Sequence, residues 1–215
     1  MSDRLGVAPV DSGARPAIGT GRRQRKTEAT RTALEDAAWA LFEEHGFAAT
    51  TIEDITERVD VSVRTFFRHF PSKESVLFGD ARALEGPFRR ALLGRPPGES
   101  PCRSLRAALR ELAPLVEAQR DRHLLRHRIL QEPGGPKIED HLGALTEKGT
   151  MLREVIAERM GSTVDDPGTQ LLAGVVATIM DVTYRQWIAT GGRADLSGLV
   201  NETFDSLAHL MSLTA

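Results

Sequence analysis

Apolar residues recur along most of this chain at intervals of three and four positions, which places them on one face of an α-helix. Stripes of this kind predict six longer helices, over about residues 27–45, 102–117, 119–131, 137–160, 165–190 and 195–213. No run of four or more residues shows the convincing apolar and polar alternation of a half-buried strand. The pattern therefore predicts an all-α fold.

Polar residues that can cap a helix precede three shorter predicted helices: Thr51 before 52–59, Ser62 before 62–69 and Ser72 before 73–85. Asp54 stands three residues after Thr51, as in a capping box. Gly46 stands where the first long helix would end with a left-handed residue. The pair Gly86 and Pro87 interrupts the third short helix. The expected total is about nine helices.

The N-terminal residues differ in composition from the predicted helices that follow them. Residues 1–21 hold four Gly and two Pro and show no periodicity, which predicts a mobile tail. A basic cluster follows, made of Arg22, Arg23, Arg25, Lys26 and Arg31. This cluster can either solubilise the tail or form an arm that touches DNA phosphates or a minor groove. We expect a flexible basic tail over residues 1–25.

The net charge says little about function, and only the local distribution of charged residues is informative. The 215 residues are 40% hydrophobic and 27% charged, with a formal net charge of -2, so bulk charge gives no argument for nucleic-acid binding. The single cysteine, Cys102, cannot form an internal disulfide, which fits a reducing cytosol. No apolar run approaches the ~18 residues of a membrane span, and the N-terminus lacks the apolar region of a secretory signal. We expect a soluble, cytoplasmic protein.

Two short helices joined by a tight turn, after a longer helix, predict a helix-turn-helix. The second helix of that motif enters the major groove of DNA. Helical spacing turns Val61, Phe66 and Phe70 toward the core and leaves four residues facing out: Val63, Arg64, Phe67 and Arg68. Residues 61–73 contain basic side chains and no acid, whereas the two preceding helices are acidic. This local segregation of charge is the footprint of a DNA-binding surface.

The runs Gly46-Phe-Ala-Ala-Thr-Thr-Ile-Glu-Asp-Ile-Thr56 and Val61-Ser-Val-Arg-Thr-Phe-Phe-Arg-His-Phe-Pro-Ser-Lys-Glu-Ser-Val-Leu77 resemble the DNA-binding domain of tetracycline-repressor-like (TetR family) regulators. The resemblance covers residues 27–78. It implies an all-α homodimer that binds a palindromic operator and releases it when a small molecule binds the C-terminal domain. The implied division is a DNA-binding domain over 26–72 and a ligand-binding and dimerisation domain over 73–215.

The resemblance also implies roles for single residues. Those expected to face the bases are Val63, Arg64 and Thr65, and those expected along the phosphate backbone are Thr51, Phe67, His69 and Lys73. Ser62 and Arg68 belong to the same expected DNA-binding surface. Arg64 is the best candidate for direct readout, because arginine can bond O6 and N7 of guanine together. The family often has tyrosine in place of Phe67 and glycine in place of Asp60.

The last two predicted helices carry apolar residues that suit a dimer interface in this family: Leu171, Val175, Ile179, Leu199, Thr203, Phe204, Leu207 and Leu210. A core within one chain is the alternative use of the same residues. Operator half-site spacing favours the dimer, since one helix-turn-helix rarely reads enough base pairs.

Candidates for a ligand pocket are Phe88, Leu124, His127, Met151, Met180, Asp181, Tyr184 and Trp187. Ordinary core packing is the alternative for each of them. Asp181 lies in an apolar helix and could pair with Arg185, four residues on. The arginines between residues 120 and 128 are expected in solvated faces, in ion pairs between subdomains or in contact with an acidic partner.

No cofactor or metal site is expected: His123 and His127 stand four apart, but no further ligand is near in sequence. The motifs of common enzyme classes are missing. The sequence therefore favours a ligand-responsive transcriptional regulator that is not an enzyme, and the resemblance favours a repressor. Two alternatives stay open, a helical small-molecule binder or enzyme without DNA function and a DNA-binding protein without a ligand.

Overall fold

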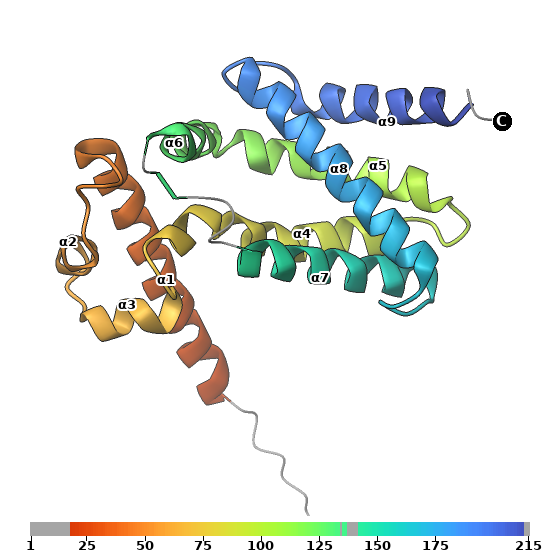
Figure 1. Cartoon of the computed structure of the whole chain (residues 1–215). Coiled ribbons are helices and arrows are strands. Elements are labelled where there is room, and N and C mark those ends of the chain that lie inside the picture. The colour runs from red at the N-terminus through yellow and green to blue at the C-terminus, as the bar shows by residue number, and fades with distance from the viewer. Residues whose placement is uncertain (1–17, 134, 137–141, 213–215) are drawn as a thin grey trace, which may run out of the picture.

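A computed structural model of the chain describes residues 18–133, 135–136 and 142–212 (Figure 1). Its nine α-helices within these ranges are α1 (Ile18–His45), α2 (Ile52–Arg58), α3 (Val63–His69), α4 (Asp80–Leu93), α5 (Pro101–Glu117), α6 (Arg120–Gln131), α7 (Leu142–Met160), α8 (Pro167–Ala189) and α9 (Leu196–Ser212). A short 3-10 helix, η1 (Glu74–Phe78), connects α3 to α4. The described residues contain no strand, so the predicted all-α class is confirmed.

The first three helices and η1 share one core. Phe42 of α1, Ile55 of α2 and Phe66 of α3 are all buried in it, and Leu77 of η1 closes it. Ile129 of α6 packs against the same core, so a helix of the C-terminal half seals the N-terminal domain. Figure 1 shows α6 at the end of α1 from which the chain turns into α2.

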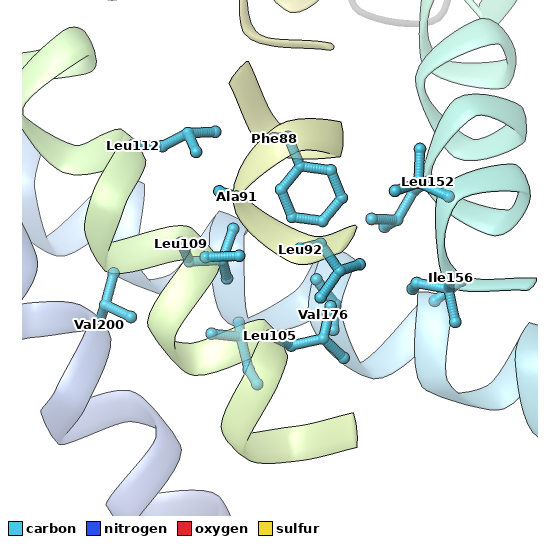
Figure 2. Close-up of a cluster of buried hydrophobic side chains, with 14 of the residues drawn as sticks. Phe88, Ala91, Leu92, Leu105, Leu109, Leu112, Leu152, Ile156, Val176 and Val200 are labelled. Atoms are coloured by element: carbon cyan, nitrogen blue, oxygen red, sulfur yellow. The ribbon is translucent and has the colours of Figure 1, made fainter. Parts of the chain in front are cut away.

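The remaining helices enclose a second core. Phe88 and Leu92 of α4, Leu105 of α5, Ile156 of α7 and Val176 of α8 meet there, as Figure 2 shows. In the wider view of Figure 1, α4 and α7 run side by side and α8 crosses the bundle toward α9. A smaller cluster around Trp187 fills the end near α6.

The basic segment before residue 26 differs from its prediction. Residues 18–25 belong to α1 rather than to a flexible tail, and residues 1–17 lie outside the described part of the chain. Arginine, lysine and glutamine lose little side-chain freedom in a helix, which favours its extension through this segment. The Thr27 hydroxyl donates to the carbonyl of Arg23 at 3.0 Å along the same helix.

The predicted break at Gly86 and Pro87 is also absent, because α4 runs through Pro87. A proline inside a helix costs about 3 kcal/mol or more. Burial of Phe88, Ala91 and Leu92 directly after it offsets that cost. The predicted helix over 73–85 is instead divided into η1 and the start of α4. None of the described helices is both long and apolar enough to cross a bilayer.

Candidate nucleic-acid interface and domain junction

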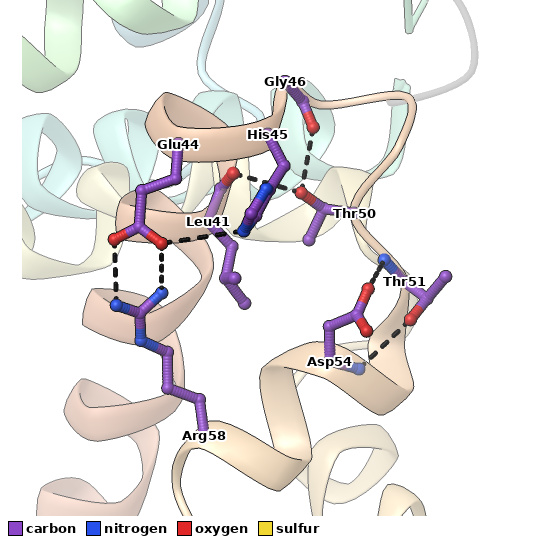
Figure 3. Close-up of polar contacts among 8 residues, drawn as sticks. All are labelled: Leu41, Glu44, His45, Gly46, Thr50, Thr51, Asp54 and Arg58. Carbon is purple, nitrogen blue, oxygen red and sulfur yellow. Dashed lines mark hydrogen bonds and ion pairs between the residues drawn. The ribbon is translucent and has the colours of Figure 1, made fainter.

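The turn between α1 and α2 is held by hydrogen bonds from the Thr50 side chain to backbone carbonyls (Figure 3). Gly46 has φ 83°, the left-handed conformation expected after the end of a helix. The buried hydroxyl of Thr50 reaches the carbonyl oxygens of Leu41 at 3.2 Å and Gly46 at 2.9 Å. These contacts fix where α2 begins relative to α1.

A capping box starts α2, as predicted. The Thr51 hydroxyl accepts from the backbone N–H of Asp54 at 3.1 Å, and the Asp54 carboxylate accepts from the backbone N–H of Thr51 at 2.8 Å (Figure 3). These hydrogen bonds hold the pKa of Asp54 below its usual value. Thr51 itself stays exposed at the helix N-terminus, where a phosphate can approach.

The turn into α3 is equally defined. Asp60 takes φ 52°, a left-handed conformation that aspartate tolerates better than most residues. Ser62 then caps α3, since its hydroxyl accepts from the backbone N–H of Thr65 at 3.2 Å. The Ser62 and Thr65 hydroxyls lie 3.0 Å apart. The predicted caps at Thr51 and Ser62 are therefore confirmed, although the contacts of Ser62 and Thr65 with DNA stay predictions.

The α3 helix has two chemically different faces. Phe66 and Phe70 are buried in the N-terminal core, as the helical spacing predicted. Arg64 and Arg68 are exposed, and Phe67 is 52% exposed. Val63 is half-buried beside them. Among the residues the structure describes, neither arginine forms an ion pair, so both guanidinium groups are available to phosphates or base edges.

The acidic side chains of the preceding helices are partly neutralised within the domain. Arg58 forms a two-pronged contact with Glu44, with both N–O distances 2.8 Å (Figure 3). Hydrogen bonding to Arg58 lowers the pKa of Glu44, and the same contact raises the pKa of Arg58. The pair joins α2 to the last turn of α1 and keeps one carboxylate bound to a cation.

Arg31 joins the end of α3 to α1. One guanidinium N–H donates to the backbone carbonyl of His69 at 2.8 Å, and the guanidinium lies 4.3 Å from the centre of the Phe70 ring. His69 is half-buried, and burial lowers the pKa of its imidazole, helped by the nearby charges of Arg68 and Arg31. Arg31 thus positions α3, a role that its place in the basic cluster did not reveal.

Lys73 makes contacts inside the domain, and its expected contact with the phosphate backbone stays a prediction. Its ammonium donates to the carbonyl oxygens of Phe47 and Thr50, both at 2.6 Å, and lies 4.3 Å from the centre of the Phe47 ring. Burial lowers the pKa of Lys73. Two of its three N–H donors are used inside the domain. The side chain therefore ties η1 to the loop before α2.

The junction between the two domains contains a polar group on α6. Arg126 donates to the carbonyl of Leu77 at 3.2 Å and to the Tyr184 hydroxyl of α8 at 2.8 Å. It also lies 2.7 Å from Nδ1 of the buried His123. Arg122 forms an ion pair with Asp36 of α1, an example of the ion pairs expected between subdomains. One helix thus contacts α1, η1 and α8.

A cavity of about 590 Å³ opens at this junction. Glu43 of α1 lines it on one side. The residues that line it from α6 and α8 are Asp121, Leu124, His127, Arg128, Tyr184, Arg185, Ile188 and Ala189. Leu124, His127 and Tyr184 are therefore the predicted pocket candidates that the structure brings together.

The other pocket candidates lie elsewhere. Phe88 is buried in the second core, and Met151 and Met180 pack against that core. Trp187 is fully buried in the smaller cluster, where Ala113 and Leu196 pack close by. Asp181 is exposed and forms the ion pair with Arg185 that was considered from their spacing. The described residues contain no group of three or more side chains able to hold a metal ion.

The predicted dimer residues divide into two groups. Ile179 and Phe204 are buried in the core of the single chain, and Val175 and Leu207 pack against that core. Leu199 packs on the smaller cluster, and Thr203 accepts a hydrogen bond from Thr183 at 3.1 Å. Only Leu171 and Leu210 are strongly exposed, at 71% and 61%.

A capped helix-turn-helix that exposes arginines on its second helix, joined to a larger helical domain, defines a DNA-binding transcriptional regulator. Two family models match this chain. Residues 34–78 match the model described as bacterial regulatory proteins, tetR family, and residues 99–212 match the MftR C-terminal domain. Because the second match alone spans more than half of the sequence, the chain belongs to the TetR family, whose members are regulators and not enzymes.

Relatives of known description agree with this assignment. The chain is 34% identical to the HTH-type transcriptional regulator TcmR of Streptomyces glaucescens, over 79% of this chain and 77% of that protein. It is 25% identical to the putative mycofactocin biosynthesis transcriptional regulator MftR of Mycobacterium tuberculosis, over 76% and 82% of the two chains. The crystal structure of Thermus thermophilus FadR, a repressor in complex with lauroyl-CoA, superposes with a TM-score of 0.53 at 27% identity, covering 83% of this chain and 93% of that one.

Proposed function

We propose that this regulator is a ligand-responsive repressor that binds a palindromic operator as a homodimer and leaves it when a small molecule binds. The exposed face of α3, with Arg64 and Arg68 free of ion pairs within the described residues, is the observation that carries the proposal. In this role Arg64 contacts base edges with Val63 and Thr65, while Thr51, Ser62, Phe67 and Arg68 lie along the phosphates. Since operator DNA is cytoplasmic in bacteria, the protein acts there.

Dimerisation is supported by the apolar residues that the single chain leaves outside. Leu171 of α8 is 71% exposed and Leu210 of α9 is 61% exposed. Large exposed apolar side chains on adjacent helices suit an interface between two copies. A dimer also presents two copies of α3 to successive major grooves, about 34–36 Å apart on one face of DNA.

Ligand response is supported by the junction cavity, whose volume of about 590 Å³ is in the range of small-molecule sites. The similar repressor from Thermus thermophilus was solved with lauroyl-CoA bound, which supports a ligand-controlled mechanism for this chain as well. Operator and effector would favour different states of the dimer. Their coupling is reciprocal, so operator DNA weakens effector binding by the same factor.

Footprinting of purified protein on DNA from upstream of its own coding region tests the proposal. We expect protection of a near-palindrome by a dimer, with affinity that falls steeply as salt rises. Folded dimeric protein that protects no sequence at low salt would overturn DNA regulation. It would favour the alternative of a helical binder without DNA function, for which the junction cavity would be the site.

A further inference from the structure

The exposed face of α3 contains an aromatic ring that contacts with phosphates do not explain. Phe67 is 52% exposed and lies between the exposed side chains of Arg64 and Arg68. The ring carries no hydrogen-bond donor or acceptor, so it cannot bond to a phosphate oxygen. Apolar surface gains free energy when it leaves water. An apolar group of the DNA is therefore the partner that suits this ring.

The ring of Phe67 is held against the core of the N-terminal domain. The buried Phe66 ring meets it edge to face, with ring centres 5.7 Å apart and planes at 90°. Phe66 is itself supported by the buried ring of Phe70, whose centre lies 5.4 Å away. Val63, half-buried, stands one helical turn before Phe67 and adds aliphatic surface to the same face. Phe67 and Val63 together form a small apolar patch on a supported helix.

The chemistry of the major groove limits what this patch can meet. Base edges there present hydrogen-bond donors and acceptors, and thymine also presents its C5 methyl group. Arg64 and Arg68 beside the patch attract the DNA polyanion and bring α3 toward the groove. In Figure 1, α3 lies at the edge of the N-terminal domain that is far from α8 and α9, so the C-terminal helices do not cover it.

We propose that Phe67 reads a thymine in each half-site of the operator through contact between its ring and the C5 methyl group. A ring that lies along the backbone can reach this methyl, because the methyl projects from the base edge into the groove. The inference rests on the proposed function, to which it adds a base that is specified by apolar contact. Arg64 and Phe67 then recognise different base pairs, one by hydrogen bonds and the other by shape and burial.

Replacement of thymidine by deoxyuridine removes the methyl group and leaves the hydrogen-bonding groups of the base unchanged. Each thymine of the operator located by footprinting is replaced in turn, and affinity is measured by fluorescence anisotropy. We expect one position where replacement in a single half-site weakens binding of the wild type about three- to fivefold, the value of about one buried methyl group. Replacement in both half-sites should weaken it about ten- to twentyfold.

Two variants at exposed positions of α3 assign the methyl preference to the ring. Phe67→Ala should bind the thymine and uracil operators with equal affinity, because the ring that distinguishes them is gone. Arg68→Ala is the matched control. It should bind both operators more weakly than the wild type, since a cation near the phosphates is lost, and it should keep the preference for the methyl group.

Three results would overturn the contact with thymine. The first is wild-type affinity that no replacement of thymine changes. The second is a methyl preference that persists in Phe67→Ala, which would assign it to DNA shape or to another residue. The third is an equal loss in Phe67→Ala on both operators, as expected if the ring packs on a deoxyribose. Failure of the wild type to bind the unmodified operator would overturn the proposed function as well, and it is detected before any thymine is replaced.

Discussion

The two domains differ in what they leave on the surface. Within the described residues of α1 to η1, Phe67 is the one exposed large apolar side chain, and it lies between Arg64 and Arg68 on α3. Leu171, Leu210 and Met211 of α8 and α9 are each more than 60% exposed. The first domain thus presents polar and cationic chemistry to a partner, and the second presents apolar surface. The difference fits DNA as the partner of the first domain and, in the proposed dimer, a second copy of the chain as the partner of the other.

Removing a buried ring tests the N-terminal side of this comparison most severely. Phe66→Ala deletes a side chain with 0% exposure in the core of α1 to α3, so we expect a loss of about 3–5 kcal/mol in unfolding free energy. Chemical denaturation followed by circular dichroism measures it. Phe67→Ala, one residue on, should leave stability within about 0.5 kcal/mol because that ring is exposed. Equal losses in the two variants would contradict the two-faced description of α3.

A charge introduced on the exposed apolar surface of α9 tests the C-terminal half of this comparison. Leu210→Asp places an unpaired carboxylate in the proposed dimer interface, and we expect the dimer to weaken by about 3 kcal/mol, more than a hundredfold in dissociation constant. Sedimentation equilibrium measures the change. The control is Leu115→Asp on α5, an exposed leucine on another helix. Dimerisation that survives Leu210→Asp unchanged would remove α9 from the interface.

Arg64→Ala sharpens the claim that α3 reads sequence. We expect a loss of about 1–3 kcal/mol at the protected operator, and a smaller loss on operators altered at the base pair that Arg64 contacts. Fluorescence anisotropy with labelled duplexes measures both. Arg103→Ala, an exposed arginine at the start of α5, should have no effect. The base contact would be excluded by a uniform loss across all sequences.

Lys73→Met separates an internal role from a phosphate contact. The variant loses two hydrogen bonds to backbone carbonyls, so we expect a fall of about 1–2 kcal/mol in stability with the fold kept. The salt dependence of DNA binding should stay unchanged below the melting temperature. A flatter salt dependence with normal stability would instead support the phosphate contact predicted from the sequence.

Substitution of His69 has the smallest expected effect, a change in how the melting temperature depends on pH. Burial lowers the pKa of its imidazole below the 6.5 of the unfolded state, so its stabilising contribution is present above pH 6.5 and is lost as pH falls toward the lowered pKa. We expect the melting temperature to fall less between pH 7.5 and 5 in His69→Gln than in the wild type. His209→Gln, at an exposed histidine of α9, is the control and should reproduce the wild-type profile. Identical profiles for all three proteins would show that His69 does not titrate differently on folding.

The sequence predicted the N-terminal domain in more detail than the rest because its signals are local. The caps at Thr51 and Ser62, the left-handed Gly46 and the inward turn of Phe66 and Phe70 each follow from neighbouring residues. Lys73 was placed by family position, and its contacts with Phe47 and Thr50 depend on a fold across more than twenty residues of chain.

The candidate pocket could be predicted only in part. Leu124, His127 and Tyr184 lie at the cavity, but no local pattern of residues joins Glu43 of α1 to residues on α6 and α8. Helical periodicity identifies an apolar face without saying which neighbour covers it, so Phe88 and Met180 were equally good candidates until the second core was known. The Arg126 contacts span three helical elements and have no local signature.

The contacts of α6 also determine which DNA-binding domains could replace the one in this chain. A foreign DNA-reading module would have to offer an acid at position 36 for Arg122, a free carbonyl at the end of its 3-10 turn for Arg126 and an apolar recess for Ile129. Two of these requirements are side-chain identities, and one is a matter of backbone path alone. A chimera that respects all three would inherit the proposed effector control of this chain while reading a different operator, and one that misses them would bind DNA without responding.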